Sequence, residues 1–60
     1  MYFFEGDRVT VVNKERKSYG YSGIVTSIPD PNDNVVFVKI DLEENSTWFF
    51  ASELTKEGWN

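Results

Sequence analysis

The chain of 60 residues contains no cysteine and no histidine. Without cysteine, the protein can form neither disulfides nor thiolate metal sites. Without histidine, it lacks the usual general base and the commonest zinc ligand. These absences disfavour most enzyme chemistries, so we expect a non-enzymatic protein with no cofactor and no metal.

Long hydrophobic runs are also missing. The sequence has no run of the roughly 18 apolar residues that a membrane-spanning helix needs. The apolar residues 1–4 are too few for a signal peptide. We therefore expect a soluble, cytoplasmic protein.

Basic residues are scarce, because six Lys and Arg against ten Asp and Glu give a formal net charge of −4. Clustered cations supply the nonspecific affinity of proteins for nucleic acid, so this balance argues against a protein whose main task is to bind phosphates. An acidic surface favours solubility or a basic partner protein. The acidic residues do not follow the Asp-x-Asp-x-Asp-Gly spacing of a calcium loop, and we read them as solvated turn charges.

Aromatic residues are plentiful for so short a chain. A single domain spanning residues 1–60 buries only about 60% of its unfolded surface, so its core is marginal unless large side chains fill it. Each aromatic ring can bury about 150–250 Å². The ten aromatic residues are Tyr2, Phe3, Phe4, Tyr19, Tyr21, Phe37, Trp48, Phe49, Phe50 and Trp59. Either nearly all of them are core, or some form a surface kept for a partner.

The first half of the chain predicts two strands. Residues 8–12 alternate, which places Val9 and Val11 on the core side. Residues 13–18 are polar and form a loop. Residues 23–28 are rich in β-branched side chains, and a bulge near residues 26–27 would let both Val25 and Ile28 face the core.

The second half predicts two more strands around polar turns. Residues 29–34 are a dense cluster of turn formers, and residues 43–46 form a second turn. Residues 35–41 alternate with Val36, Val38 and Ile40 on the core side, and residues 47–50 form the next strand. Residues 51–54 suit a single 3₁₀ turn, capped by Ser52, with Leu54 folding back as a plug. The expected fold is all-β: a small barrel of four to five antiparallel strands with a 3₁₀ turn near the C-terminus.

The order of these motifs resembles the SH3-like barrel superfamily. The resemblance spans residues 6–54 and rests on Gly-Asp-x-Val-x-Val from residue 6, Gly-x-x-Gly-x-Val from residue 20, Val-x-Val-x-x-Asp from residue 36, and Phe49 five residues before Leu54. Within the superfamily, residues 19–25 are similar to the KOW motif of ribosomal and transcription-elongation proteins. The element order also resembles the small photosystem I subunit that helps to dock ferredoxin.

The same order of elements resembles the type II dihydrofolate reductases. These enzymes carry a Val-Gln-Ile-Tyr run in their active site, where this chain has Ser46-Thr47-Trp48-Phe49. We therefore do not expect this chain to have the reductase activity. A small oligomeric enzyme with a site between subunits remains the weakest of the functional alternatives.

Three consecutive aromatic residues in one expected strand indicate a binding surface. Successive side chains of a strand point to opposite faces, so if Phe49 is inside, Trp48 and Phe50 are outside. There they are free to form a patch with Tyr19 and Tyr21, in a protein-binding module or an accessory subunit whose acidic rim selects a basic partner or a second copy of the chain. The alternative is a second core, in which these rings are covered by Tyr2, Phe3, Phe4 or Trp59.

The loop from Lys14 to Tyr21 carries the alternative function. Lys14, Arg16 and Lys17 precede Tyr19 and Tyr21, a mixture suited to phosphate contact and base stacking in a KOW-like nucleic-acid-binding module. Acidic residues lie within and around this segment, which favours a solvated loop.

Overall fold

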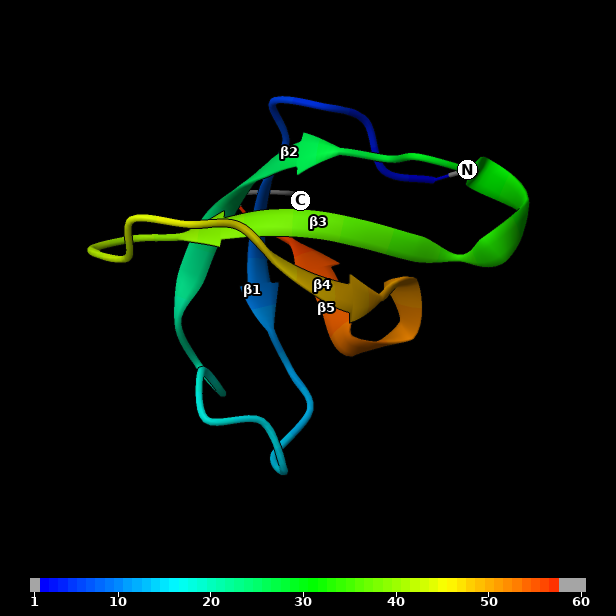
Figure 1. Cartoon of the computed structure of the whole chain (residues 1–60). Coiled ribbons are helices and arrows are strands. Elements are labelled where there is room, and N and C mark those ends of the chain that lie inside the picture. Colours follow the sequence, from blue (N-terminus) through cyan, green and yellow to red (C-terminus); the bar gives the residue numbers. More distant parts are fainter. Residues whose placement is uncertain (1, 58–60) are drawn as a thin grey trace.

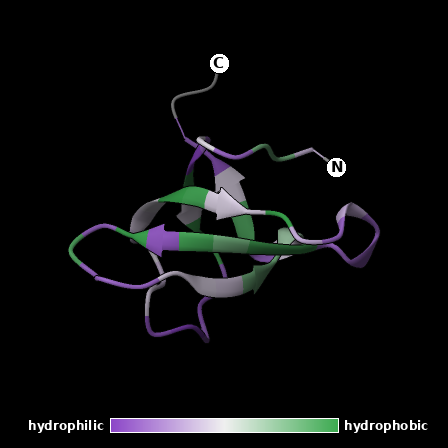
Figure 2. Ribbon diagram, turned by 45° about the horizontal axis from the view of Figure 1, so that its top comes forward, coloured by the Kyte–Doolittle hydropathy of each residue, from purple (hydrophilic) through white to green (hydrophobic). Residues whose placement is uncertain are grey.

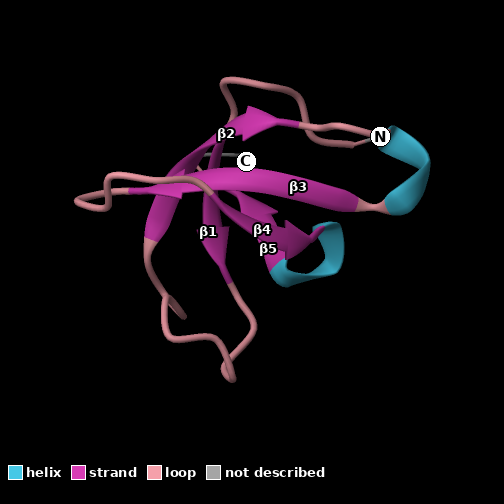
Figure 3. Cartoon of the chain, viewed as in Figure 1, coloured by secondary structure: helices cyan, strands magenta, loops and turns pink. Residues whose placement is uncertain are grey.

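Five antiparallel strands and two 3₁₀ turns make up the computed structural model within residues 2–57, the part of the chain that it describes (Figures 1 and 3). The strands are β1 (Arg8–Val11), β2 (Ser22–Ser27), β3 (Val35–Ile40), β4 (Thr47–Phe50) and β5 (Leu54–Lys56), and the turns are η1 (Pro31–Asp33) and η2 (Ala51–Glu53). The expected all-β fold with a 3₁₀ turn near the C-terminus is therefore confirmed. Within these residues, no helix is long and apolar enough to cross a membrane.

The strands form one curved sheet in the order β4-β3-β2-β1-β5. The first four strands follow one another along the chain, whereas β5 returns to pair with β1. Strands β4 and β5 are the two edges, and η2 joins them directly (Figure 3). Within the described residues no ladder pairs β4 with β5, so hydrogen bonds do not close the barrel.

The core lies on the concave side of this sheet. Its buried residues are Phe3, Val9, Val11, Val25, Val36, Val38, Ile40, Phe49 and Leu54. Every inward position expected for the first and third strands is confirmed, and so is the plug at Leu54. In Figure 2 the hydrophobic stretches lie mainly in the strands, while most loops are hydrophilic.

Strand β2 carries the predicted bulge. The register between β2 and β3 shifts between Val25 and Ser27. Because a bulge adds one residue to one strand, it reverses the alternation beyond it. Val25 is buried, and Ile28 packs against the core while remaining partly exposed.

Two glycines allow the sharp bends of this small sheet. Gly6 has a φ of +93°, in the region that side chains of other residues disfavour. At Gly23, a Cβ atom would lie 2.5 Å from the carbonyl oxygen of Lys39. The close approach of β2 to β3 therefore requires the absence of a side chain at residue 23.

Two local details differ from the sequence reading. The turn at residues 29–34 contains η1, where the Asp30 side chain accepts a hydrogen bond from the Asn32 N–H. The expected cap by Ser52 is wrong, because η2 begins after Phe50, whose N–H donates to Oε1 of Glu53 at 2.9 Å. The longer Glu53 side chain reaches back over the turn, which a serine hydroxyl at position 52 does not.

Candidate binding surface

The outer face of the β3–β4 hairpin carries a cluster of large apolar side chains. Val35 pairs with Phe50, and Phe37 pairs with Trp48, across the two strands. Between them, Val36 and Phe49 point to the core. We call Val35, Phe37, Trp48 and Phe50 the outer-face patch.

The register brings these side chains close together. The N–H of Ala51 donates to the carbonyl of Asn34 at 2.8 Å, so residues 34 and 51 form a hydrogen-bonded pair. Such pairs alternate with non-hydrogen-bonded ones, whose side chains approach more closely. Both cross-strand pairs of the outer-face patch are therefore of the closer kind.

Trp48 and Phe50 form the exposed centre of the patch. Their ring centroids lie 5.1 Å apart with an interplanar angle of 80°, the edge-to-face geometry that aromatic pairs favour. Trp48 is 45% exposed and Phe50 is 49% exposed, whereas Val35 and Phe37 are more deeply buried. The prediction that Phe49 lies inside and its two neighbours outside is confirmed.

The N-terminal aromatic residues lie elsewhere in the fold. Phe3 joins the main core, while Tyr2 and Phe4 are exposed. The ammonium group of Lys56, on β5, lies 4.3 Å from the ring centroid of Tyr2 and 5.6 Å from that of Phe4. Trp59, the remaining member of the expected second core, lies outside the described residues.

The Arg16–Glu53 ion pair borders the patch. Nη2 and Nε of Arg16 donate to the two carboxylate oxygens of Glu53 at 2.9 and 3.0 Å. Nη2 of Arg16 also donates to the carbonyl oxygen of Trp48 at 3.1 Å. The guanidinium carbon lies 5.0 Å from the Trp48 ring centroid and 4.4 Å from that of Phe49. Arg16 is thereby held in one position by an ion pair, a backbone acceptor and two rings.

These contacts keep Glu53 ionised. The hydrogen bonds from Arg16 are the largest cause, and those from Asn13 and the Phe50 N–H add to them. Although partial burial acts in the opposite direction, the pKa of Glu53 falls from 4.5 to about 2. The pair is therefore fully charged throughout the physiological range of pH.

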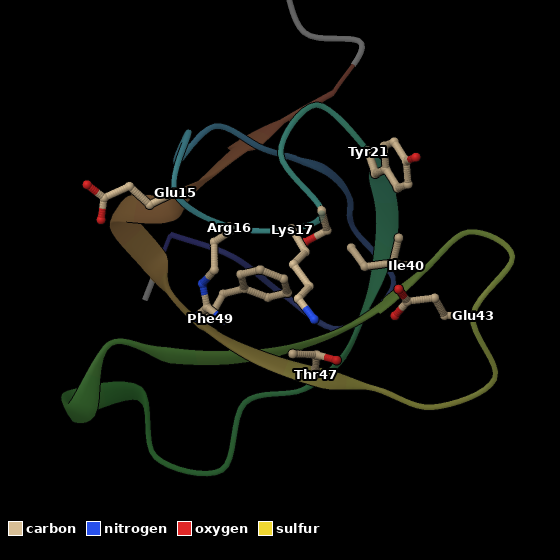
Figure 4. A pocket seen from close by; sticks show the side chains of 9 residues that line it. Glu15, Arg16, Lys17, Tyr21, Ile40, Glu43, Thr47 and Phe49 are labelled. Atoms are coloured by element: carbon tan, nitrogen blue, oxygen red, sulfur yellow. The ribbon is translucent and has the colours of Figure 1, made fainter.

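The two tyrosines of the expected site lie on the long loop between β1 and β2. Tyr21 lines a cavity of about 430 Å³ that reaches Ile40 and Phe49 in the core. Figure 4 shows the side chains of Arg16 and Lys17 extending toward Phe49, while Glu15 points away. Arg16 lines the same cavity and also contacts Trp48 of the outer-face patch. Tyr19 is 46% exposed, and no aromatic pair among residues 2–57 joins it to the outer-face patch.

The basic residues of the same loop do not form one cationic face. The charge of Arg16 is paired with Glu53. Lys17 lines the cavity together with Glu15 and Glu43, and Lys14 is exposed. Of the cations expected to contact phosphate, only the two lysines form no ion pair within residues 2–57.

Acidic residues lie at both ends of the β3–β4 hairpin. Asp30 and Asp33 precede β3, and Glu43 and Glu44 lie in the connection from β3 to β4. None of these four carboxylates forms an ion pair within the described part of the chain. In contrast, Asp41 is held by the guanidinium of Arg8 at 2.9 Å, which lowers the pKa of its carboxyl group. Residues 2–57 contain no group of three or more carboxylates placed to hold a metal ion.

Sequence reasoning missed half of the patch. Alternation leaves Phe37 and Val35 on the face opposite the core, but their cross-strand pairing with Trp48 and Phe50 depends on the register between two strands. The alternation of residues 35–40 was the signal available for finding them. A scan of the sequence against protein-family models finds no match, and a search of curated proteins finds none either.

Proposed function

We propose that this protein is a non-enzymatic protein-binding module that uses the outer-face patch as its contact surface. The exposed edge-to-face pair of Trp48 and Phe50 carries this proposal. Aromatic side chains dominate the energetics of protein interfaces, particularly where they are held in place before the partner arrives. Both rings are fixed on a strand that is paired with β3 along its length.

The partner is a basic protein segment. The unpaired carboxylates of Asp30 and Asp33 lie at one end of the β3–β4 hairpin that carries the patch, and those of Glu43 and Glu44 lie at the other. Charges at the rim of an interface select partners and steer association more than they add to affinity. A segment with an apolar or aromatic side chain between lysines or arginines complements this surface.

The module is of the SH3-like type. The strand order β4-β3-β2-β1-β5 and the 3₁₀ turn between β4 and β5 support this proposal, together with the resemblance over residues 6–54. The KOW-like alternative is less well supported, because Arg16 is engaged by Glu53 and the net charge is −4. No observation favours an intersubunit enzyme site.

Selection of phage-displayed peptides tests the proposed function. We expect the wild type to enrich peptides that combine Lys or Arg with a large apolar residue. Trp48→Ala should weaken the binding of an enriched peptide by about 30-fold or more, as loss of a hot-spot side chain does. Binding is measured by isothermal titration calorimetry, and circular dichroism of each variant reports whether the fold is retained.

Tyr2→Ala is the matched control, because Tyr2 is another exposed aromatic residue but lies beside β5. It should leave the affinity within about twofold of the wild type, the spread expected of a residue outside the contact. Equal losses for both variants, or enrichment of peptides without basic residues, would contradict the proposal. Global unfolding of Trp48→Ala would show that the Trp48 side chain is needed for stability, and would also contradict the proposal.

A further inference from the structure

The free edge of β4 is a hazard for self-association. Strand β4 pairs with β3 on one side and is an edge of the sheet on the other. The segment of residues 45–52, Asn-Ser-Thr-Trp-Phe-Phe-Ala-Ser, contains no charge, no glycine and no proline. Uncharged, aromatic segments of this length at a sheet edge readily pair with another strand.

The register shows which backbone groups face this edge. Because residues 34 and 51 are hydrogen-bonded to each other, the alternation directs the peptide groups of Trp48 and Phe50 away from β3. These groups are the ones that an added strand would use. One carbonyl and one N–H among them already have side-chain partners.

Arg16 and Glu53 supply those partners. Arg16 donates to the carbonyl of Trp48, and Glu53 accepts from the N–H of Phe50, at 3.1 and 2.9 Å. The two side chains are joined to each other by two further hydrogen bonds and are largely buried, with 25% and 12% of their side-chain surfaces exposed. An incoming strand would have to displace all of these contacts at once.

We propose that the Arg16–Glu53 pair closes the edge of β4 against strand addition by a second copy of this chain. A second copy is the occupant because β4 can pair antiparallel with itself about a twofold axis, and no charged side chain in residues 47–50 opposes this pairing. The edge of β5 is less suited, since that strand has three residues and ends at Lys56, which pairs with Asp7.

The double variant Arg16→Met/Glu53→Met tests this proposal. It removes both blocking side chains, preserves the net charge and leaves no buried charge unpaired. Sedimentation velocity across a wide range of concentration should then show dimers, with self-association at least about tenfold stronger than in the wild type. Hydrogen exchange should show new protection of the Trp48 amide, which faces the open edge.

The control is Arg8→Met/Asp41→Met. This variant also removes an arginine–carboxylate pair that is joined by two hydrogen bonds, and it also preserves the net charge. Arg8 lies on β1, and Asp41 directly follows β3. Its self-association should equal that of the wild type. The proposal is overturned if both double variants behave alike, or if the Arg16→Met/Glu53→Met dimer leaves the Trp48 amide unprotected.

Arg16→Lys serves if the double variant fails to fold. Lysine keeps the charge beside Glu53 but lacks the planar fork that reaches Glu53 and the Trp48 carbonyl together. We expect the strength of its self-association to lie between that of the wild type and that of a variant with an open β4 edge. A folded Arg16→Lys variant with the wild-type sedimentation profile at every concentration would contradict the proposal. These outcomes do not depend on whether the outer-face patch binds peptides.

Discussion

At the scale of single residues, Glu53 takes part in more side-chain hydrogen bonds than any other carboxylate in residues 2–57. Its carboxylate accepts from Arg16, from Asn13 at 2.6 Å and from the backbone of Phe50. It thereby ties the long β1–β2 loop to the turn between the two edge strands. Such a network depends on the negative charge, because charged acceptors form stronger hydrogen bonds than neutral ones.

The ionisation of Glu53 makes stability depend on pH. Its folded-state pKa of about 2 lies below the ordinary value of 4.5, so the stabilisation is fully present above pH 4.5 and is lost as the pH falls to 2. We expect Glu53→Gln to lower the free energy of unfolding by about 2 kcal/mol at pH 7, and the difference from the wild type to vanish near pH 2. Urea unfolding, monitored by tryptophan fluorescence, measures this difference in unfolding free energy at each pH. A difference that stays constant from pH 7 to pH 2 would refute this role of the charge.

Gly23 is a second residue whose identity is required by its surroundings. A methyl group there meets the Lys39 carbonyl at 2.5 Å, so the backbone of β2 or β3 must shift. We expect Gly23→Ala to cost about 1–3 kcal/mol of unfolding free energy in a chemical denaturation experiment. Thr26→Ala, at an exposed position of the same strand, should cost about 1 kcal/mol or less. Equal costs would show that the sheet relaxes around residue 23.

At the scale of elements, β5 completes the sheet. Its three residues pair with β1, opposite the side on which β1 pairs with β2. Leu54 anchors β5 in the core and is 6% exposed. The short turn η2 therefore connects the two edges and also delivers Glu53 to the edge of β4.

We expect Leu54→Ala to destabilise the protein by about 2–5 kcal/mol, the cost of removing a buried leucine side chain. Thr55→Ala, at the next and exposed position of β5, should cost about 1 kcal/mol or less. Thermal unfolding monitored by circular dichroism compares the two. A small loss for Leu54→Ala would show that β5 contributes little to the core.

At the scale of the whole molecule, the charge is distributed unevenly. Within residues 2–57 both arginines form ion pairs, whereas four carboxylates at the two ends of the β3–β4 hairpin form none, those of Asp30, Asp33, Glu43 and Glu44. Within the described residues, the unpaired charges of the hairpin and its flanking turns are these four carboxylates and Lys39, so they are negative on balance. This distribution favours basic partners and disfavours phosphate backbones.

This charge distribution leads us to expect very weak binding to nucleic acid. Fluorescence polarisation with a labelled single-stranded RNA and a DNA duplex should give dissociation constants above about 100 µM at physiological salt, the weak end of nonspecific binding. Micromolar affinity that falls with salt, and that weakens further in Lys17→Ala, would instead support the KOW-like alternative. Lys39→Ala is the control, since it also removes one positive charge at an exposed position but lies outside the loop.

The inward positions of the strands could be read directly from the chain. Alternation along residues 35–40 placed Val36 and Val38 in the core, and the broken alternation from Val25 to Ile28 predicted the bulge. Both depend on the period of two along a strand, which is a local property of the backbone. The opposite exposure of Phe49 and Trp48 followed from the same period.

The register between strands and the contacts across loops required the folded chain. Phe37 meets Trp48 through the pairing of β3 with β4, and β5 lies beyond the last strand that the local pattern predicts. Arg16 and Glu53 are 37 residues apart in sequence, and they meet because the β1–β2 loop folds onto the end of β4. A charge in a polar loop has the same local pattern whether it is solvated or paired. Only the three-dimensional arrangement makes Arg16 part of the structure, because long-range contacts are set by packing and not by neighbours in the sequence.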